Sequence, residues 1–323
     1  MFARRSLENI SSLVLAVIVC TGLVPISGQA QPMDYPITRI SDKIHVIYGP
    51  LAVPNAENHG FRNNVVIITT SAGMVVFDPG GSEVAGEMVV SKVKSITDAP
   101  IVAVFNCHAH GDHWLGNEGV KKFFPNVDIY GHPIMQAKVK GPVGEQWVKL
   151  INTATNGTAG GKHVVAPNKT VNDGDVVTIG DTKFRIYHTG RAHSDNDIMI
   201  EIVGTNILFV GDVVRNGMHG LMDEDASFKG NISAIDLIAS KSFKLYIPGH
   251  GKAGGKEILN SYRGYLSAVY DTVKALYAKG MADFEMKPKV VEAAAAYKDW
   301  VGFDLRIGPH VSRAYLQVEA EAF

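Results

Sequence analysis

The chain has 323 residues, of which 46% are hydrophobic and 20% are charged, and its formal net charge is -1 at pH 7. This composition is that of an ordinary globular protein, without low-complexity tracts or a heptad pattern. Lys and Arg are scattered among nearly equal numbers of acidic residues, which argues against a protein that binds nucleic acid through phosphate contacts.

The N-terminus has the pattern of a secretory signal peptide. Arg4 and Arg5 precede an apolar stretch from Leu13 to Ile26, and small residues at Gly28 and Ala30 fit a cleavage site. A membrane anchor is the alternative, but the apolar run is shorter than the roughly 20 residues that span a bilayer. We therefore expect cleavage after Ala30, a periplasmic or secreted protein, and no stable membrane insertion after cleavage.

The two cysteines, Cys20 and Cys107, predict no disulfide. A lipid attachment at Cys20 is disfavoured, because the bulky Val19 precedes it where a small residue is expected. Cleavage of the signal removes Cys20 and leaves one cysteine, so an intramolecular disulfide cannot form. Cys107 could be a nucleophile, but strand alternation favours a small buried hydrophobic side chain.

Short β-rich runs broken by Gly, Asn and Pro predict an antiparallel meander, then a helix, a buried strand and a second helix. The predicted strands are Ile44–Tyr48, Val65–Thr69, Met74–Phe77 and Ile101–Phe105, and the helices are Val84–Ser95 and Gly119–Phe124. Beyond Pro133 the chain is predicted to be partly helical over Met135–Leu150. The small residues of 152–161 predict a mobile insertion within 133–161, either an ordinary surface loop or an active-site lid.

The second half repeats this organisation and ends in helices. Its predicted strands are Val176–Ile179, Phe184–His188, Asp197–Val203, Ile207–Val210 and Leu245–Ile247, with a helix at Ile232–Ser240. Apolar residues at helical spacing then predict helices at Lys256–Lys279, Lys289–Trp300 and Val311–Ala322. The sequence therefore predicts two similar sheet-plus-helix halves followed by a helical segment.

The loop after the strand at Ile101–Phe105 concentrates side chains that bind metals. His108, His110, Asp112 and His113 lie within six residues of one another. Imidazole nitrogen and carboxylate oxygen are ligand types that Zn2+ prefers. A solvated loop is the alternative, but burying so many imidazoles without a metal would leave them crowded and partly desolvated. The density of the cluster therefore favours a metal site.

Three further candidate ligands lie at strand ends in the second half of the chain. They are His193, Asp212 and His250, and each has a glycine nearby. A site for two metal ions needs more donors than the first loop supplies. We therefore expect these side chains to complete it.

The complete set of motifs resembles that of metallo-β-lactamase-superfamily hydrolases. The matching motifs are His108-x-His110-x-Asp112-His113, Gly190-x-x-His193-Ser194, Gly211-Asp212 and Pro248-Gly249-His250-Gly251. The resemblance implies an α/β fold, a four-layer αβ/βα sandwich of two mixed sheets with helices outside and a metal site at the sheet edge. Together with the N-terminal pattern and the C-terminal helical spacing, it predicts a signal peptide at 1–30, a metallo-β-lactamase-type domain at 31–255 and a C-terminal helical extension at 256–323, packed on the domain.

The resemblance also implies a site for two Zn2+ ions. It assigns His108, His110 and His193 to one ion, Asp112, His113 and His250 to the other, and Asp212 to a bridging position. A carboxylate bridge is similar to the thioesterase-like branch typified by glyoxalase II. The best-known lactamases have a cysteine there, and this departure lowers the expectation of a conventional β-lactamase.

Four other residues are candidates for supporting roles. Asp78 resembles the buried acid that orients a ligand histidine in this family. Arg215 stands where many lactamases place a lysine for the substrate carboxylate, with an ordinary surface arginine as the alternative. Trp114 and His219 are candidates for lining the cleft, with simple packing as the alternative.

These assignments predict an exported dinuclear zinc hydrolase that uses metal-bound hydroxide to cleave an ester, thioester, lactone or amide bond. Asp112 is the predicted catalytic residue, because it can combine metal ligation with proton relay. Opening of β-lactam antibiotics is the alternative, which export favours and Asp212 disfavours. Persulfide oxidation at a single iron is disfavoured, because such sites use fewer ligands. The partner is a small-molecule substrate, and the sequence leaves its identity and the oligomeric state open.

Overall fold

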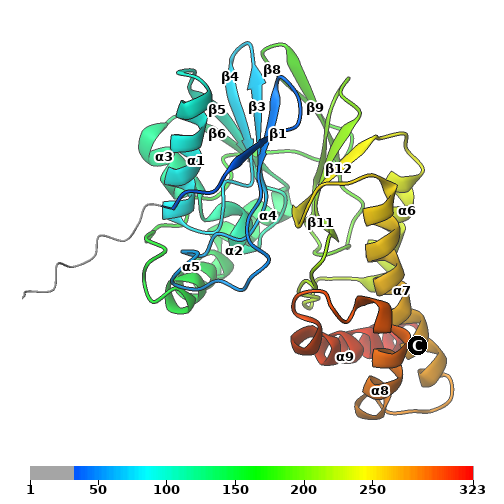
Figure 1. Cartoon of the computed structure of the whole chain (residues 1–323). Coiled ribbons are helices and arrows are strands. Elements are labelled where there is room, and N and C mark those ends of the chain that lie inside the picture. Colours follow the sequence, from blue (N-terminus) through cyan, green and yellow to red (C-terminus); the bar gives the residue numbers. More distant parts are fainter. Residues whose placement is uncertain (1–32, 323) are drawn as a thin grey trace, which may run out of the picture. The chain divides into compact units, whose positions relative to one another are not determined.

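The computed structural model describes residues 33–322, so the predicted signal peptide and Cys20 lie outside the described residues. The strands form two sheets (Figure 1). The seven-stranded sheet pairs, in this order, β1 (Ile37–Arg39), β2 (Ile44–Ile47), β3 (Val65–Thr70), β4 (Gly73–Phe77), β5 (Ile101–Phe105), β6 (Asp128–Gly131) and β7 (Lys169–Thr170). The five-stranded sheet pairs β12 (Leu245–His250), β11 (Ile207–Arg215), β10 (Met199–Ile202), β9 (Thr182–Tyr187) and β8 (Val176–Ile179).

Helices alternate with strands in both halves of the chain and continue after the last strand. The first half contains α1 (Glu83–Ile96), α2 (Gly111–Trp114), α3 (Asn117–Phe123), α4 (Pro133–Lys140) and α5 (Pro142–Ala154). The second half contains α6 (Phe228–Ala239), α7 (Lys256–Tyr277), α8 (Asp283–Ala293), a 3-10 turn (Ala295–Tyr297) and α9 (Phe303–Glu321). No described helix combines the length and apolar character that crossing a membrane requires.

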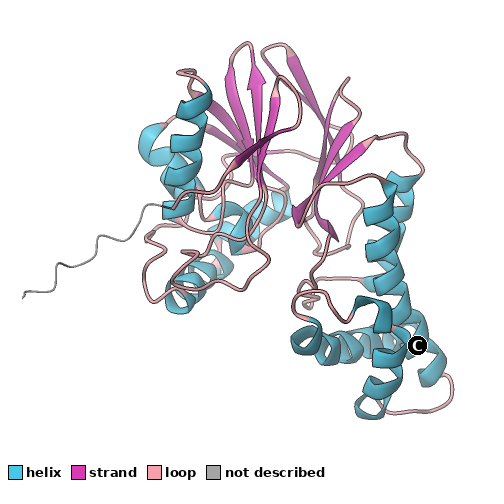
Figure 2. Ribbon diagram, viewed as in Figure 1, coloured by secondary structure: helices cyan, strands magenta, loops and turns pink. Residues whose placement is uncertain are grey.

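Three packed interfaces arrange these elements in four layers (Figure 2). Between the sheets, Phe77 of the first contacts Phe184 and Phe209 of the second, with ring centroids 5.7 and 5.5 Å apart. On the outer face of the first sheet, α1 buries Val89 and Val93 against strand side chains. Helices α6 and α7 cover the outer face of the second sheet. The expected αβ/βα sandwich is therefore confirmed.

The directions of the strands bring the carboxyl ends of several of them to one edge of the sandwich. The predicted meander is present, because β1 to β4 pair antiparallel. From β4 to β7 the pairing is parallel, and β11 and β12 are also parallel. In α/β proteins, functional side chains gather beyond the carboxyl ends of parallel strands. Most of the predicted ligands follow β5 or lie towards the ends of β11 and β12, and His193 lies in the loop between β9 and β10.

The C-terminal helices share a core with the second sheet, and two of them begin earlier than predicted. Helix α8 begins at Asp283 and α9 at Phe303, although Pro288 and Pro309 lie inside them. Proline usually breaks a helix interior. Here the helices bury apolar residues on both sides of each proline, and this packing favours continuation of the helix.

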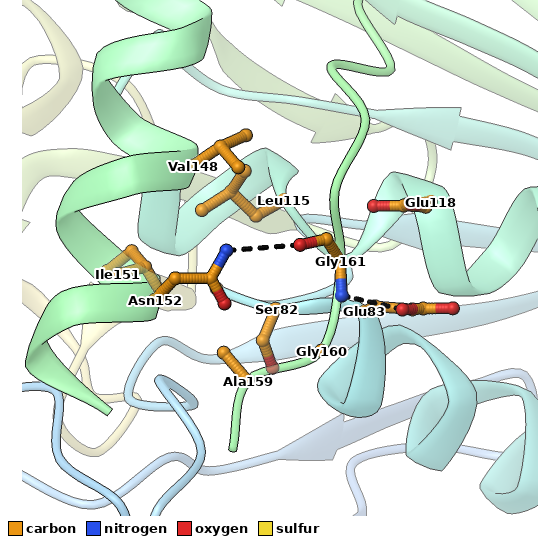
Figure 3. A pocket seen from close by; sticks show the side chains of 11 residues that line it. Ser82, Glu83, Leu115, Glu118, Val148, Ile151, Asn152, Ala159, Gly160 and Gly161 are labelled. Atoms are coloured by element: carbon orange, nitrogen blue, oxygen red, sulfur yellow. Dashed lines mark hydrogen bonds between the residues drawn. The ribbon is translucent and has the colours of Figure 1, made fainter. Parts of the chain in front are cut away.

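Residues 152–161, predicted to be mobile, have fixed partners on α1 and α5. The Gly161 N–H donates to Glu83 Oε2 at 2.6 Å, and Asn152 Nδ2 donates to the Gly161 carbonyl at 3.1 Å (Figure 3). The cavity beneath this segment has a volume of about 10 Å3, enough for about one water molecule. This cavity is therefore too small for a substrate.

Candidate metal centre

The fold gathers all the predicted ligands into one buried cluster. His108 and His110 follow β5, Asp112 and His113 lie on α2, and the loop between β9 and β10 carries His193. Asp212 lies on β11, and His250 is the last residue of β12. None of these side chains belongs to a residue that is more than 8% exposed.

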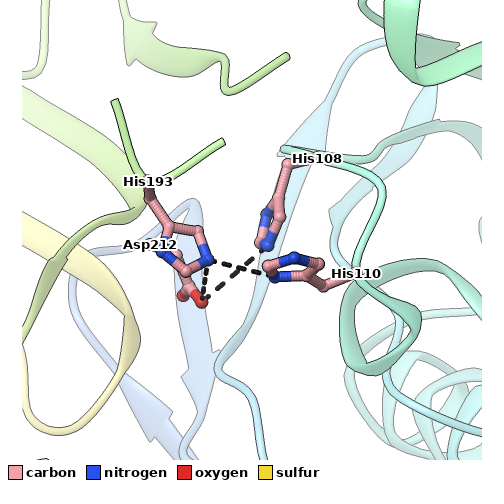
Figure 4. Close-up of side chains that lie close together, drawn as sticks. All are labelled: His108, His110, His193 and Asp212. Carbon is pink, nitrogen blue, oxygen red and sulfur yellow. Dashed lines mark hydrogen bonds and ion pairs between the residues drawn. The ribbon is translucent and has the colours of Figure 1, made fainter. Parts of the chain in front are cut away.

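The ligand atoms form two groups. One atom each from His108, His110, His193 and Asp212 lies within 4.8 Å of the others (Figure 4). Atoms of Asp112, His113 and His250 form a second group with the same spacing. This is the division that the sequence resemblance implies for two metal ions.

Asp212 lies between the two groups. Its Oδ2 is 3.4 Å from His193 Nε2, in the first group. Its Oδ1 is 3.6 Å from His250 Nε2, in the second group. Its Oδ2 also lies 3.5 Å from His113 Nε2, in the second group. The carboxylate of Asp212 therefore borders both groups and could contact ions held by either.

Several of these atoms are buried without a hydrogen-bond partner among the described residues. They are Nε2 of His108, His113 and His250, Oδ2 of Asp112 and Oδ1 of Asp212. A buried polar atom left unsatisfied costs about 1–3 kcal/mol. Convergent imidazole nitrogens and carboxylate oxygens are also the donors that Zn2+ binds. The residues present therefore fit a metal centre.

Hydrogen bonds on the far side of two imidazoles fix their orientation. His113 Nδ1 is 2.8 Å from Asp78 Oδ2, and His250 Nδ1 is 3.0 Å from the carbonyl oxygen of Arg62. Each contact turns Nε2 toward the cluster, as such partners do for metal-binding histidines. Asp78 is fully buried and has a left-handed backbone with φ of 50°, a sparsely populated conformation that is often retained at functional sites.

Cys107 neither acts as a simple hydrophobic residue nor offers a nucleophile. Its Sγ lies 2.8 Å from Asp78 Oδ2 and 3.0 Å from His108 Nδ1. Burial, reinforced by the charge of Asp78, raises the pKa of the thiol well above its usual value. The protonated thiol can therefore donate to Asp78. The expected burial is confirmed, since Cys107 is 1% exposed and belongs to the core between the sheets, but the thiol also contacts polar atoms at the edge of the ligand cluster.

The electrostatics of most of the cluster favour the protonation states that metal binding requires, although at His113 nearby acidic groups outweigh burial and hold the pKa well above its usual value. Burial, with the charges of nearby imidazoles, lowers the pKa of His108 well below its usual value. Burial raises the pKa of Asp112, but His113, His250 and Arg62 more than offset this and hold that pKa well below its usual value. Neutral imidazole and ionised carboxylate are the forms that bind metals.

The remaining predicted residues, for which the sequence left alternatives open, have different surroundings in the structure. Arg215 is 3% exposed and forms an ion pair with Asp212, so it is not a surface arginine. His219 borders a cavity, and its Nε2 lies 3.0 Å from the Tyr297 carbonyl oxygen. Trp114 is fully buried and donates to the Ala109 carbonyl at 3.0 Å. The expectation that Trp114 lines the cleft is therefore wrong.

A cavity of about 220 Å3 opens beside the cluster. It is lined by Pro54, Arg62, His110, Asp112, Trp147, Leu150, Ile151, Ala154, Arg215, His219, Leu221 and Arg306. A second cavity of about 590 Å3 shares His110, Trp147, Leu150 and Leu221 with it. Helix α5 supplies much of the apolar wall, so part of 133–161 does flank the site. The sequence predicts walls from residues 51–62 and 133–161, which include Arg62 and Trp147, but it missed Arg306, because no motif marks that residue.

Comparisons with known proteins agree with this geometry. The sequence model of the family described as "Metallo-beta-lactamase superfamily" matches residues 60–250. A type 2 metallo-β-lactamase of Bacteroides fragilis is 24% identical over 264 residues, covering 75% of this chain and 91% of the relative. A hydroxyacylglutathione hydrolase of Francisella tularensis subsp. holarctica is 22% identical over 170 residues, 52% of this chain and 54% of that protein. The structure of a metallo-β-lactamase from Pontibacter korlensis aligns with a TM-score of 0.55 at 20% identity, covering 70% of this chain and 96% of that one.

Proposed function

The chain belongs to the metallo-β-lactamase superfamily of hydrolases, and we propose that it is an exported enzyme that holds two Zn2+ ions. The convergence of buried, unpartnered ligand atoms carries this proposal. His108, His110 and His193 would hold one ion, Asp112, His113 and His250 the other, and Asp212 both. Export rests on the signal-peptide pattern of the N-terminal sequence.

The residues around the cluster suit hydrolysis. Zinc bound there would supply an acidified water, with a pKa near 7 instead of 15.7, and a Lewis acid for a substrate oxygen. Asp112 combines an ionised carboxylate with a place on the cavity wall. It can therefore accept a hydrogen bond from the attacking water and take up its proton.

We propose that the bond cleaved is an ester, thioester, lactone or amide. A carboxylate at Asp212, in place of a cysteine, supports this assignment because it resembles the thioesterase-like branch of the family. The similarity to a hydroxyacylglutathione hydrolase points in the same direction. No serine or cysteine nucleophile is needed, which agrees with the protonated state of Cys107.

Opening of β-lactams is the second candidate. The Bacteroides fragilis relative, which is a metallo-β-lactamase by name and aligns over 91% of its length, favours it. The predicted export favours it as well, since β-lactams act outside the cytoplasm. Arg215 could pair with a substrate carboxylate, although its guanidinium is already bound to Asp212.

A substrate panel separates the two candidates. Zinc-loaded mature protein would be assayed on a thioester, a simple lactone and a chromogenic cephalosporin, with and without a chelator. We expect thioester or lactone turnover that the chelator abolishes and added zinc restores, with little cephalosporin opening. Efficient, chelator-sensitive cephalosporin opening would favour the second candidate. Turnover that is insensitive to chelation would contradict both.

A further inference from the structure

Three guanidinium groups border the 220 Å3 cavity beside the proposed metal site. Arg62 precedes β3, Arg215 ends β11, and Arg306 lies on α9. The side chains of Arg62 and Arg215 are 13% and 3% exposed. The Nε atoms of both are buried without a hydrogen-bond partner among the described residues. Three arginines thus lie around one cavity, and two of them, Arg62 and Arg215, have a buried donor without a partner.

The acidic residues nearby do not balance these three charges once metals are bound. Arg62 Nη1 lies 3.5 Å from Asp112 Oδ2, and Arg215 forms an ion pair with Asp212. Both carboxylates are proposed metal ligands. Bound metal ions would neutralise their negative charge, which would then no longer balance the arginines. Burial and the charges of Arg215 and Arg62 lower the pKa of Arg306, with Asp223 opposing. A buried excess of positive charge is costly unless an anion balances it.

Apart from the arginines and the polar residues His110, Asp112 and His219, the wall of this small cavity is apolar. Trp147, Leu150, Ile151 and Leu221 lie on its wall. Its volume of about 220 Å3 is below the ~300–1,000 Å3 typical of pockets for drug-sized ligands. The cavity therefore fits one end of a molecule, with an anionic group near the arginines and apolar carbon against α5.

The adjoining cavity has the opposite charge. It is lined by Asp223, Glu224 and Asp225, while Lys138 on its wall is paired with Asp195 and Asp225. A second anionic group on the same ligand would be repelled there. The two cavities together therefore favour a ligand with its anionic group at one end only.

We propose that Arg306 and Arg62 form an anion-binding subsite that selects amphiphilic substrates, in which one carboxylate or sulfate-type oxyanion is joined to an apolar chain. This proposal rests on the proposed function, since the bond to be cleaved must reach the metal ligands. Arg306 lies on α9, outside the matched residues 60–250. The C-terminal helices thereby become part of the substrate-binding machinery.

The test measures binding of inert ligands to zinc-loaded protein by calorimetry. Octanesulfonate, octanoate and neutral octanamide would be titrated into the wild type and into Arg306→Gln. Arg185→Gln, which alters a partly exposed arginine on β9, is the matched control. We expect at least one anion to bind about tenfold or more tightly than octanamide. Arg306→Gln should weaken binding of that anion by about 10- to 100-fold, because a charge-assisted hydrogen bond is lost, while Arg306→Lys restores part of it.

This test distinguishes failure of the anion-binding subsite from failure of the proposed metal site. Equal affinity for octanamide and both anions, or an Arg306→Gln variant within twofold of wild type, would overturn the subsite. A preference for octanesulfonate or for octanoate supports it and identifies the oxyanion. Zinc content is measured in the same samples. If zinc is absent but the anion preference and its loss in Arg306→Gln persist, the proposed function fails and the subsite stands.

Discussion

Replacing Asp112 with asparagine is expected to lower turnover by about 10^2- to 10^4-fold while leaving the fold intact. The substitution keeps the shape of the side chain but removes its charge. Asp112 Oδ2 lies 3.2 Å from His250 Nε2 and belongs to the second ligand group. The variant would therefore lose both a metal ligand and the group that takes up the proton. Steady-state kinetics on the substrate identified by the panel measures the effect.

A matched control separates this effect from a general loss of charge. Asp42→Asn makes the same chemical change at a side chain that is 92% exposed and pairs with Arg39 at the surface. We expect wild-type turnover in this control and native circular dichroism in both variants. Near-normal turnover in Asp112→Asn would remove Asp112 from the proposed mechanism.

Gly249→Ala is expected to damage the metal centre without changing any ligand. A Cβ atom at this position would lie 2.1 Å from Asp212 Oδ1 and 3.0 Å from His113 Cε1. Asp212 cannot move freely, because it is paired with Arg215. We expect zinc affinity and turnover to fall by at least about 10- to 100-fold, the range typical when the support of a metal ligand is lost.

Gly308→Ala provides the control for this second substitution. A Cβ atom there would meet only the end of the Lys287 side chain, at 3.8 Å. Gly308 lies inside α9 directly before Pro309, whose ring crowds the Cβ of a preceding helical residue, so no gain in stability from alanine is expected. This variant should keep full activity and zinc affinity. Wild-type zinc binding and turnover in Gly249→Ala would contradict this prediction, because the loop would then have shifted enough to accommodate the added Cβ atom.

The central strands could be predicted because burial on both faces makes them continuous apolar runs. Strand β4 is buried at every position, and its β-branched residues have no helical spacing. Strands β1, β6 and β7 were missed, because all three are short, and β1 and β7 are also largely exposed. The starts of α8 and α9 were also misplaced, since tertiary packing carries both helices across a proline.

The ligand cluster could be located from the sequence because its members lie in short motifs at strand ends. The rest of the site depends on tertiary contacts that no local pattern encodes. Arg306 reaches the cavity only because α7 to α9 pack as they do, and Trp147 does so through the placement of α5. Trp114 was misjudged, because a helix of four residues gives too little periodicity to show which face is buried.

The most direct measurement is the metal content of the mature protein, purified without chelator and analysed by mass spectrometry of the elements. We expect two zinc ions per chain, turnover that chelation abolishes, and full recovery only after two equivalents of zinc are added back. A single iron per chain, or unchanged turnover in protein stripped of metal, would contradict a dinuclear zinc hydrolase.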